Sequence, residues 1–246
     1  MQFWQLLKIN IIMLRRNRSG LFWTLIVPAG TYVALSILPI GAVLGDQSYS
    51  SFLLPGIIAL TVMQGGIYTL AYWMTDQRNR GVLRQLSLTP VRKFNLLLSL
   101  IVARSLVMLL QALVITLIGV IFFDAEVKGS VIWAGLFVVL GGFVFLPIGL
   151  LISTFANSYD AAAPITAGIG LPLTFLGNVF YPIQLLPGYL MVISKYLPLT
   201  FLADALRKIY LQAGGFYKVS TDLFWMLGWI VVIFAITLWR FRIDEQ

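Results

Sequence analysis

The stretch FNLLLSLIVARSLVMLLQALVITLIGVIFF, residues 94–123, decides the class of fold. Its single charged residue is Arg104. A helix needs about 20 consecutive, mainly apolar residues to cross the hydrocarbon core of a bilayer, and this stretch is longer than that. The stretch therefore predicts a helix that spans a membrane.

The composition of the whole chain has the same character. Of its 246 residues, 60% are hydrophobic and only 11% are charged, whereas a soluble domain usually carries roughly 25% charged residues. Because so few charges cannot cover a surface that faces water, much of the surface must face lipid. We expect a single transmembrane domain over residues 1–246, with little chain left for a separate soluble domain.

Other uncharged runs indicate further crossings. They lie between Arg18 and Asp46, between Asp46 and Asp76, between Lys128 and Asp160, from Ala161 to about Phe180, and from Leu223 to Trp239. Together with residues 94–123 they predict six transmembrane helices in an all-α integral membrane protein. Prolines within these runs free backbone carbonyls, which neighbouring helices or water must satisfy.

The basic residues are distributed unequally between the two sides of these helices. The N-terminal segment, the connection after the second run and the C-terminal segment hold far more Lys and Arg than the connections on the other side. The positive-inside rule then predicts that both termini lie in the cytoplasm. We interpret the net charge of +8 as attraction to the anionic lipid of the cytoplasmic leaflet, and not as a nucleic-acid site.

Two cytoplasmic segments are candidates for function. Residues 1–18 repeat apolar side chains at helical spacing before a basic cluster, which predicts an amphipathic helix on the membrane surface; the alternative is a simple extension of the first span. Residues 76–93 predict a short helix with an apolar edge and basic flanks that docks into a partner; the alternative is a positive-inside anchor. The residues concerned are Phe3, Leu7, Ile11, Arg15 and Arg16 in the first segment, and Arg78, Arg80, Gly81, Leu83, Arg84, Leu86 and Pro90 in the second.

On the opposite side, residues 181–222 form an outer region that prolines divide into short helical pieces. Asp204 precedes Arg207 and Lys208 by three and four residues, a spacing that lets one helical face pair them. We expect pieces that re-enter the membrane interface, and the alternative is an ordinary surface helix. The residues that define this region are Pro182, Pro187, Gly188, Pro198, Asp204 and Arg207.

Polar residues inside the spans are the candidates for a substrate path, namely Arg104, Gln64 and Asn178. An arginine at the centre of a span costs roughly 2.5–3.5 kcal/mol on insertion scales. Arg104 therefore either faces the interior, where it could meet an acidic substrate headgroup, or extends its side chain to the cytoplasmic surface. The sequence leaves both alternatives open.

Several kinds of chemistry are excluded by composition. The chain has no cysteine and no histidine, which excludes disulfides, thiolate nucleophiles, imidazole bases and the usual zinc sites. It contains no G-x-x-x-x-G-K-[ST] motif, so it cannot bind nucleotide phosphates by a P-loop. We expect no catalytic residue and no metal or cofactor bound by this chain.

The second cytoplasmic segment resembles the cytoplasmic loop of the ATP-binding-cassette (ABC) type 2 exporter permeases, through Gly81, Leu83, Leu86, Thr89 and Pro90. The outer region carries a more specific similarity. It lies in Phe180-Tyr181-Pro182-Ile183, Leu186-Pro187-Gly188, Leu197-Pro198-Leu199-Thr200 and Ala205-Leu206-Arg207, and Phe52-Leu53-Leu54-Pro55-Gly56 resembles the start of the family's second span. The resemblance covers nearly the whole chain.

This resemblance implies six spans preceded by an interfacial helix, with two short re-entrant helices before the last span. It also implies a permease that pairs with a second permease copy or paralogue and with two copies of an ABC ATPase, which would bind ATP and Mg. Such an exporter subunit would lie in the plasma or inner membrane of a prokaryote, with lipid around it. The apolar, aromatic-rich spans favour an amphipathic or lipid-like substrate or drug. The alternatives are polysaccharide export within the family, or a self-contained channel or secondary transporter.

Overall fold

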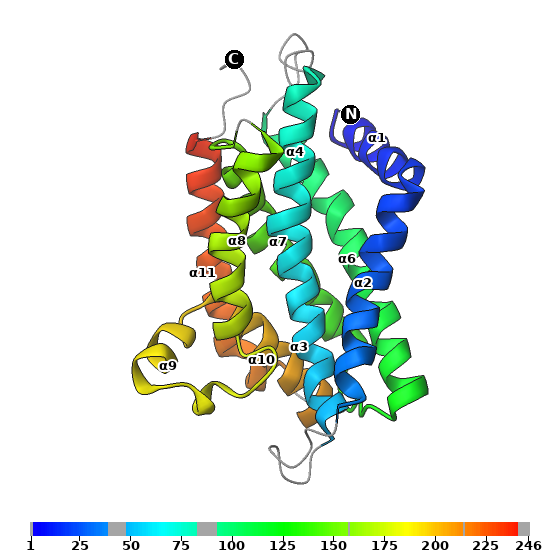
Figure 1. Ribbon diagram of the computed structural model, residues 1–246, viewed down its shortest axis with the longest axis vertical. Coiled ribbons are helices and arrows are strands. Elements are labelled where there is room, and N and C mark those ends of the chain that lie inside the picture. The colour runs from blue at the N-terminus through cyan, green and yellow to red at the C-terminus, as the bar shows by residue number, and fades with distance from the viewer. Residues whose placement is uncertain (1, 39–47, 83–92, 157, 214, 241–246) are drawn as a thin grey trace.

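The computed structural model describes residues 2–38, 48–82, 93–156, 158–213 and 215–240, and every regular element within them is a helix (Figure 1). In chain order the elements are α1 (Gln2–Arg16), α2 (Arg18–Ser36), α3 (Tyr49–Gln64), the π-helical segment η2 (Gly65–Thr69), α4 (Leu70–Asn79), α6 (Lys93–Phe123), α7 (Val131–Ser153), α8 (Tyr159–Leu176), the 3-10 turn η3 (Ile183–Leu185), α9 (Gly188–Ser194), α10 (Pro198–Gln212) and α11 (Phe216–Arg240).

Five stretches of helix in the described residues are long and apolar enough to cross a membrane. They are α2, the continuous rod α3–η2–α4, α6, α7 and α11. The bent pair α9 and α10 adds a sixth if it is taken as one broken span. The predicted all-α membrane fold with about six spans is therefore confirmed.

The fifth predicted crossing corresponds to α8 (Figure 1), which packs on α4, η2 and α7. It has 18 residues and is therefore about 27 Å long, close to the thickness of the hydrocarbon core. It is not among the five most apolar helices, because it begins with Tyr159 and Asp160 and contains Pro164 and Pro172. It also ends at Leu176, earlier than the Phe180 predicted from the uncharged run.

The helices α9 and α10 are the predicted pair of short helices before the last span. They bend by 80° at the break between Ser194 and Pro198. Pro198 is the first residue of α10, a position where proline fits because the missing N–H would have no partner in the helix. The proline pattern of the outer region thus located the break correctly.

The core of the bundle lies along α3 and α7. Every residue of α3 from Tyr49 to Met63 is buried, and α7 packs on α3, η2, α4, α6 and α11. The closest approach is between α7 and η2, where a Cβ at Gly149 would overlap the carbonyl oxygen of Gly66. Small residues allow such backbone contact between membrane helices, and dispersion over the close surfaces then stabilises the pair.

A proline in α2 leaves one carbonyl without its helical partner. Pro28 has no N–H, so the carbonyl of Thr24 receives no bond from within the helix. The side chain of Gln111 in α6 donates to this carbonyl oxygen at 2.7 Å. The sequence-based expectation that neighbouring helices satisfy such groups is met here.

Helix α1 is separated from α2 by a turn at Asn17, whose side-chain oxygen accepts a bond from the N–H of Gly20 at 3.0 Å. Figure 1 shows α1 lying across the end of the bundle, at an angle to α2. Leu7 and Asn10 are buried, and Asn10 Nδ2 donates to Ser99 Oγ of α6 at 3.2 Å. The predicted apolar stripe therefore packs on the protein itself, and α1 is no straight extension of the first span.

We predict that Gly149→Ala destabilises the bundle by about 1–3 kcal/mol, since the added methyl group forces α7 away from η2. The measurement is thermal unfolding of the purified protein in detergent. Gly168→Ala in α8 is the matched control, because nothing lies within 4 Å of a Cβ at that position and alanine favours helix over glycine. Equal unfolding temperatures for the two variants would contradict the close packing.

Candidate functional site

The end of α4 is the described part of the predicted docking segment. Gly81 has a φ of +73°, and its N–H donates to the carbonyl of Arg78 at 2.9 Å. Glycine adopts this left-handed conformation without the strain that a Cβ brings, so it ends helices. Gly81 thus separates the end of α4 from Val82, which is helical again. Leu83, Arg84, Leu86 and Pro90 lie outside the described residues.

The two arginines of this segment that the structure describes have different surroundings. Arg78 Nη1 donates to the carbonyl oxygen of Ser153, the last residue of α7, at 2.7 Å. This bond satisfies one of the carbonyls that a helix end leaves open. Arg80 pairs with Asp76 at 2.8 Å and is 69% exposed. Arg80 therefore faces outward, and Arg78 ties α4 to α7.

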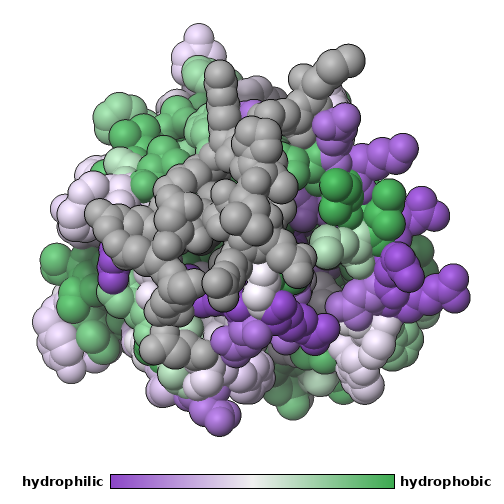
Figure 2. All heavy atoms as spheres, turned by 90° about the horizontal axis from the view of Figure 1, so that it is seen from above, coloured by the Kyte–Doolittle hydropathy of each residue, from purple (hydrophilic) through white to green (hydrophobic). Residues whose placement is uncertain are grey.

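Figure 2 shows the same end of the molecule from above, with hydrophilic side chains gathered on the side where α1 lies. Arg15 and Arg16 are exposed in the last turn of α1. Trp4 on the same helix is 71% exposed. This combination of exposed basic and large apolar side chains is typical of a helix that lies at a membrane surface.

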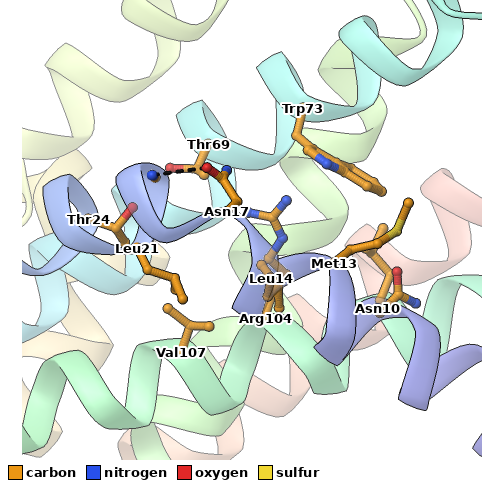
Figure 3. A pocket seen from close by; sticks show the side chains of 12 residues that line it. Asn10, Met13, Leu14, Asn17, Leu21, Thr24, Thr69, Trp73, Arg104 and Val107 are labelled. Atoms are coloured by element: carbon orange, nitrogen blue, oxygen red, sulfur yellow. Dashed lines mark hydrogen bonds between the residues drawn. The ribbon is translucent and has the colours of Figure 1, made fainter.

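A cavity of about 210 Å³ opens behind the turn between α1 and α2. Figure 3 shows Arg104 pointing into it from α6, toward Trp73 of α4 and Asn17 of the turn. The guanidinium carbon lies 5.1 Å from the centre of the Trp73 ring. Arg104 Nε is buried and has no hydrogen-bond partner in the part of the chain that the structure describes. The side chain of Arg104 thus extends into this cavity toward the turn between α1 and α2.

A second hollow of about 140 Å³ adjoins this cavity, since Thr24 and Thr69 line both. Gln64 and Gln111 contribute its polar side chains. The structure thus brings Arg104 and Gln64, two of the three predicted path residues, to neighbouring hollows between α2, α6 and the rod α3–η2–α4.

Asn178, the third predicted path residue, lies in a polar cluster of the outer region. Its side chain donates to Asp204, and its carbonyl accepts from Arg207 Nη2 at 2.9 Å. Arg207 also pairs with Asp204 at 3.5 Å and lies over the ring of Phe52 in α3, 3.9 Å from its centre. These contacts tie α10 to α3 and to the end of α8, so Asn178 is separate from Arg104 and Gln64.

The predicted pairing of Asp204 is half right. Arg207 is its partner, but Lys208 instead binds Asp222 of α11 at 2.6 Å. The prolines and the glycine of the outer region lie at the N-termini of its short helices. Pro182 precedes η3, Pro187 precedes α9 and Gly188 begins α9.

Three residues around the cavity at the α1–α2 turn were not predicted from the sequence, namely Asn10, Asn17 and Trp73. Asn10 holds α1 on α6, Asn17 forms the turn, and Trp73 covers the guanidinium of Arg104. An asparagine within an amphipathic pattern was the available signal for the first. The others depend on tertiary contacts.

An apolar helix bundle with five or six helices able to cross a membrane defines a multi-pass membrane protein. Residues 44–239 match the model of the ABC-2 family transporter proteins, and the chain belongs to this family. The family resemblance seen in the sequence is thereby confirmed. Proteins of this family are membrane transport subunits that generally work with an ABC ATPase.

Individual relatives support this assignment. The inner membrane transport permease YadH of Escherichia coli K12 is 27% identical over 206 residues, which cover 81% of this chain and 78% of the relative. The probable multidrug ABC transporter permease YbhR of the same organism is 23% identical, covering 78% of this chain and 51% of its own length. ABC transporter G family member 20 of Dictyostelium discoideum is also 23% identical, but the match covers only 27% of that longer protein.

We predict that Arg207→Met destabilises the protein by about 2–4 kcal/mol, because it leaves Asp204 without its cationic partner and removes the bond to the Asn178 carbonyl. Thermal unfolding in detergent measures the effect. Lys195→Met removes an exposed charge from the same side of the molecule and should change stability by less than about 0.5 kcal/mol. Similar losses in both variants would show that the polar cluster contributes nothing specific.

Proposed function

We propose that the chain is the membrane subunit of an ATP-driven exporter, and that a separate ABC ATPase supplies the energy. The observation that carries the proposal is the direct mechanical connection between the cytoplasmic end and the two hollows. The helix that ends at Gly81 is continuous with η2 and α3, and its residues Trp73, Thr69 and Gln64 line the hollows. A displacement of the α4 end near Gly81 would therefore move the side chains that line the two hollows.

Helix α1 supplies a second connection. It packs on α6 and is bonded to it through Asn10 and Ser99. The same α6 carries Arg104 and Gln111, which line the cavity and the adjoining hollow. A partner that presses on α1 and on the loop after α4 would therefore move both walls together.

The π-helical segment η2 gives the rod a place to bend. Its five residues, Gly65–Thr69, lie between α3 and α4, beside both hollows. Insertions of this kind often mark functional positions inside α-helices because they loosen the regular hydrogen-bond ladder. In the proposed mechanism, α4 moves with the ATPase while α3 stays fixed to the outer region through Phe52 and Arg207.

The proposed complex contains two ATPase copies, which bind ATP and Mg, and a second permease copy or paralogue. Both termini lie in the cytoplasm of a prokaryotic cell, with the outer region on the opposite side of the membrane. The asymmetry of basic residues supports this orientation. So do Arg15 and Arg16, which are exposed in the last turn of α1.

An amphipathic or lipid-like substrate or drug is the proposed cargo. The hollows combine apolar side chains such as Leu21, Val27 and Val107 with a few polar groups, a lining that suits a molecule with both characters. One relative is described as a probable multidrug permease, which agrees with this cargo class. Export of a polysaccharide is the alternative within the family.

We predict that the double variant Gly81→Trp, Arg84→Glu lowers ATP hydrolysis stimulated by the permease roughly tenfold in the purified complex with its ATPase. The tryptophan is strained at positive φ and the glutamate reverses a docking charge, so docking weakens by about 1–2 kcal/mol. The matched control, Gly215→Trp with Lys195→Glu, alters the other end of the molecule and should leave the stimulated rate unchanged.

An unchanged rate and intact complex in the first variant would contradict the docking assignment. Reconstitution addresses the energy source. If the chain alone carried an amphipathic dye across liposomes without ATP and ATPase, it would be a channel or secondary transporter.

A further inference from the structure

The cavity behind the turn between α1 and α2 contains a charge that the chain itself does not balance. Arg104 makes no ion pair with any carboxylate of the described residues, and its Nε has no hydrogen-bond partner among them. None of the described residues that line the cavity is acidic. A buried charge without a partner is costly, and contact with the Trp73 ring offsets only part of this cost.

The cavity has the size and the polar groups to hold an anion beside Arg104. Its volume of about 210 Å³ far exceeds the roughly 30 Å³ that one water occupies. Asn17, Thr24 and Thr69 also line it. Their amide and hydroxyl groups are donors that a phosphate or carboxylate can use. Figure 3 shows the guanidinium of Arg104 between Trp73 and Asn17, directed into this space.

Apart from Asn10, the remaining walls are apolar and favour a lipid over a free ion. Met13 and Leu14 of α1, Leu21 of α2, and Leu100 and Val107 of α6 line the cavity. Next to it, the outer surface of α2 exposes Phe22 and Trp23. A headgroup phosphate at Arg104 could thus continue into glycerol and acyl chains along an apolar surface.

The basic residues near the turn between α1 and α2 also favour an anionic lipid. Arg15, Arg16 and Arg18 are exposed where α1 passes into α2. Basic clusters beside a membrane helix attract anionic lipids of the cytoplasmic leaflet, at about 1 kcal/mol for each residue near the surface. Asp76 of the neighbouring α4 is paired with Arg80, so it adds little repulsion.

We propose that this cavity is a binding site for an anionic phospholipid of the cytoplasmic leaflet, with the lipid phosphate on Arg104 and its apolar part against α1, α2 and α6. The lipid completes the packing between α1 and the helices that line the hollows. Lipid composition would then set how firmly α1 is held. The site belongs to the chain alone and does not depend on the ATPase, on the cargo or on the direction of transport.

Native mass spectrometry of the purified full chain tests the proposal, with phosphatidylglycerol and phosphatidylcholine offered together. The wild type should retain a single phosphatidylglycerol in preference to phosphatidylcholine. Arg104→Gln should lower that preference roughly tenfold, the effect of losing a charged hydrogen bond. Lys195→Gln, which removes an equal charge from an exposed position at the other end of the molecule, should leave it unchanged.

A second pair of variants keeps the charge and changes the space. Val107→Trp fills the cavity and should abolish retention of the lipid. The neighbouring Leu106→Trp, on a side chain that is 48% exposed outside the cavity, should leave retention intact. If thermal unfolding shows that Arg104→Gln does not fold, this pair of variants still tests whether the lipid binds in the cavity.

Inorganic phosphate separates the two sources of the anion. An excess of phosphate without lipid should not stabilise the wild type against unfolding, whereas phosphatidylglycerol should. Stabilisation by phosphate alone, equal retention of both lipids, or retention unaffected by Val107→Trp would each overturn the proposal.

Discussion

The bilayer core offers no water to a backbone carbonyl or a charged side chain, and this constraint governs the rest of the structure. Within the described residues the chain meets it with cross-helix bonds. The side chain of Gln111 donates a hydrogen bond to the carbonyl of Thr24, which has no partner within α2 because Pro28 lacks an N–H. Arg207 is surrounded by Asp204, the Asn178 carbonyl and an aromatic ring. Arg104 differs from Arg207: the Nε of each is buried without a hydrogen-bond partner, but no carboxylate of the described residues pairs with Arg104.

These polar contacts divide the molecule into two ends with different properties. At the outer end, Arg207 and Lys208 of α10 fasten it to α3, to the end of α8 and to α11. At the other end no ion pair joins two helices of the described residues. There, next to the hollows, hydrogen bonds join α4 to α7 through Arg78, α4 to α8 through Tyr72, and α1 to α6 through Asn10. The α3–η2–α4 rod joins the two ends. Such a division suits a device in which the outer end stays fixed while the inner end moves.

The sequence was sufficient for the fold class because apolar runs and proline breaks are local signals. The helical stripe of Leu7 and Ile11 predicted α1, and the spacing of Asp204 and Arg207 predicted their ion pair. The partner of Lys208 and the environment of Asn178 could not be predicted, since both depend on helices distant in sequence. Neither could the direction of the Arg104 side chain, because a helix face is assigned only once its neighbours are placed.

Site-specific cross-linking is the most direct measurement of the claim that the end of α4 meets an ATPase. The chain has no cysteine, so a single Gly81→Cys introduces one thiol without background, and Gly215→Cys at the start of α11 serves as the comparison. With a thiol-to-amine cross-linker, we expect a product between position 81 and the ATPase of the assembled complex, and none from position 215. A product from position 215 alone would place the ATPase at the opposite end of the molecule and contradict its contact with the end of α4.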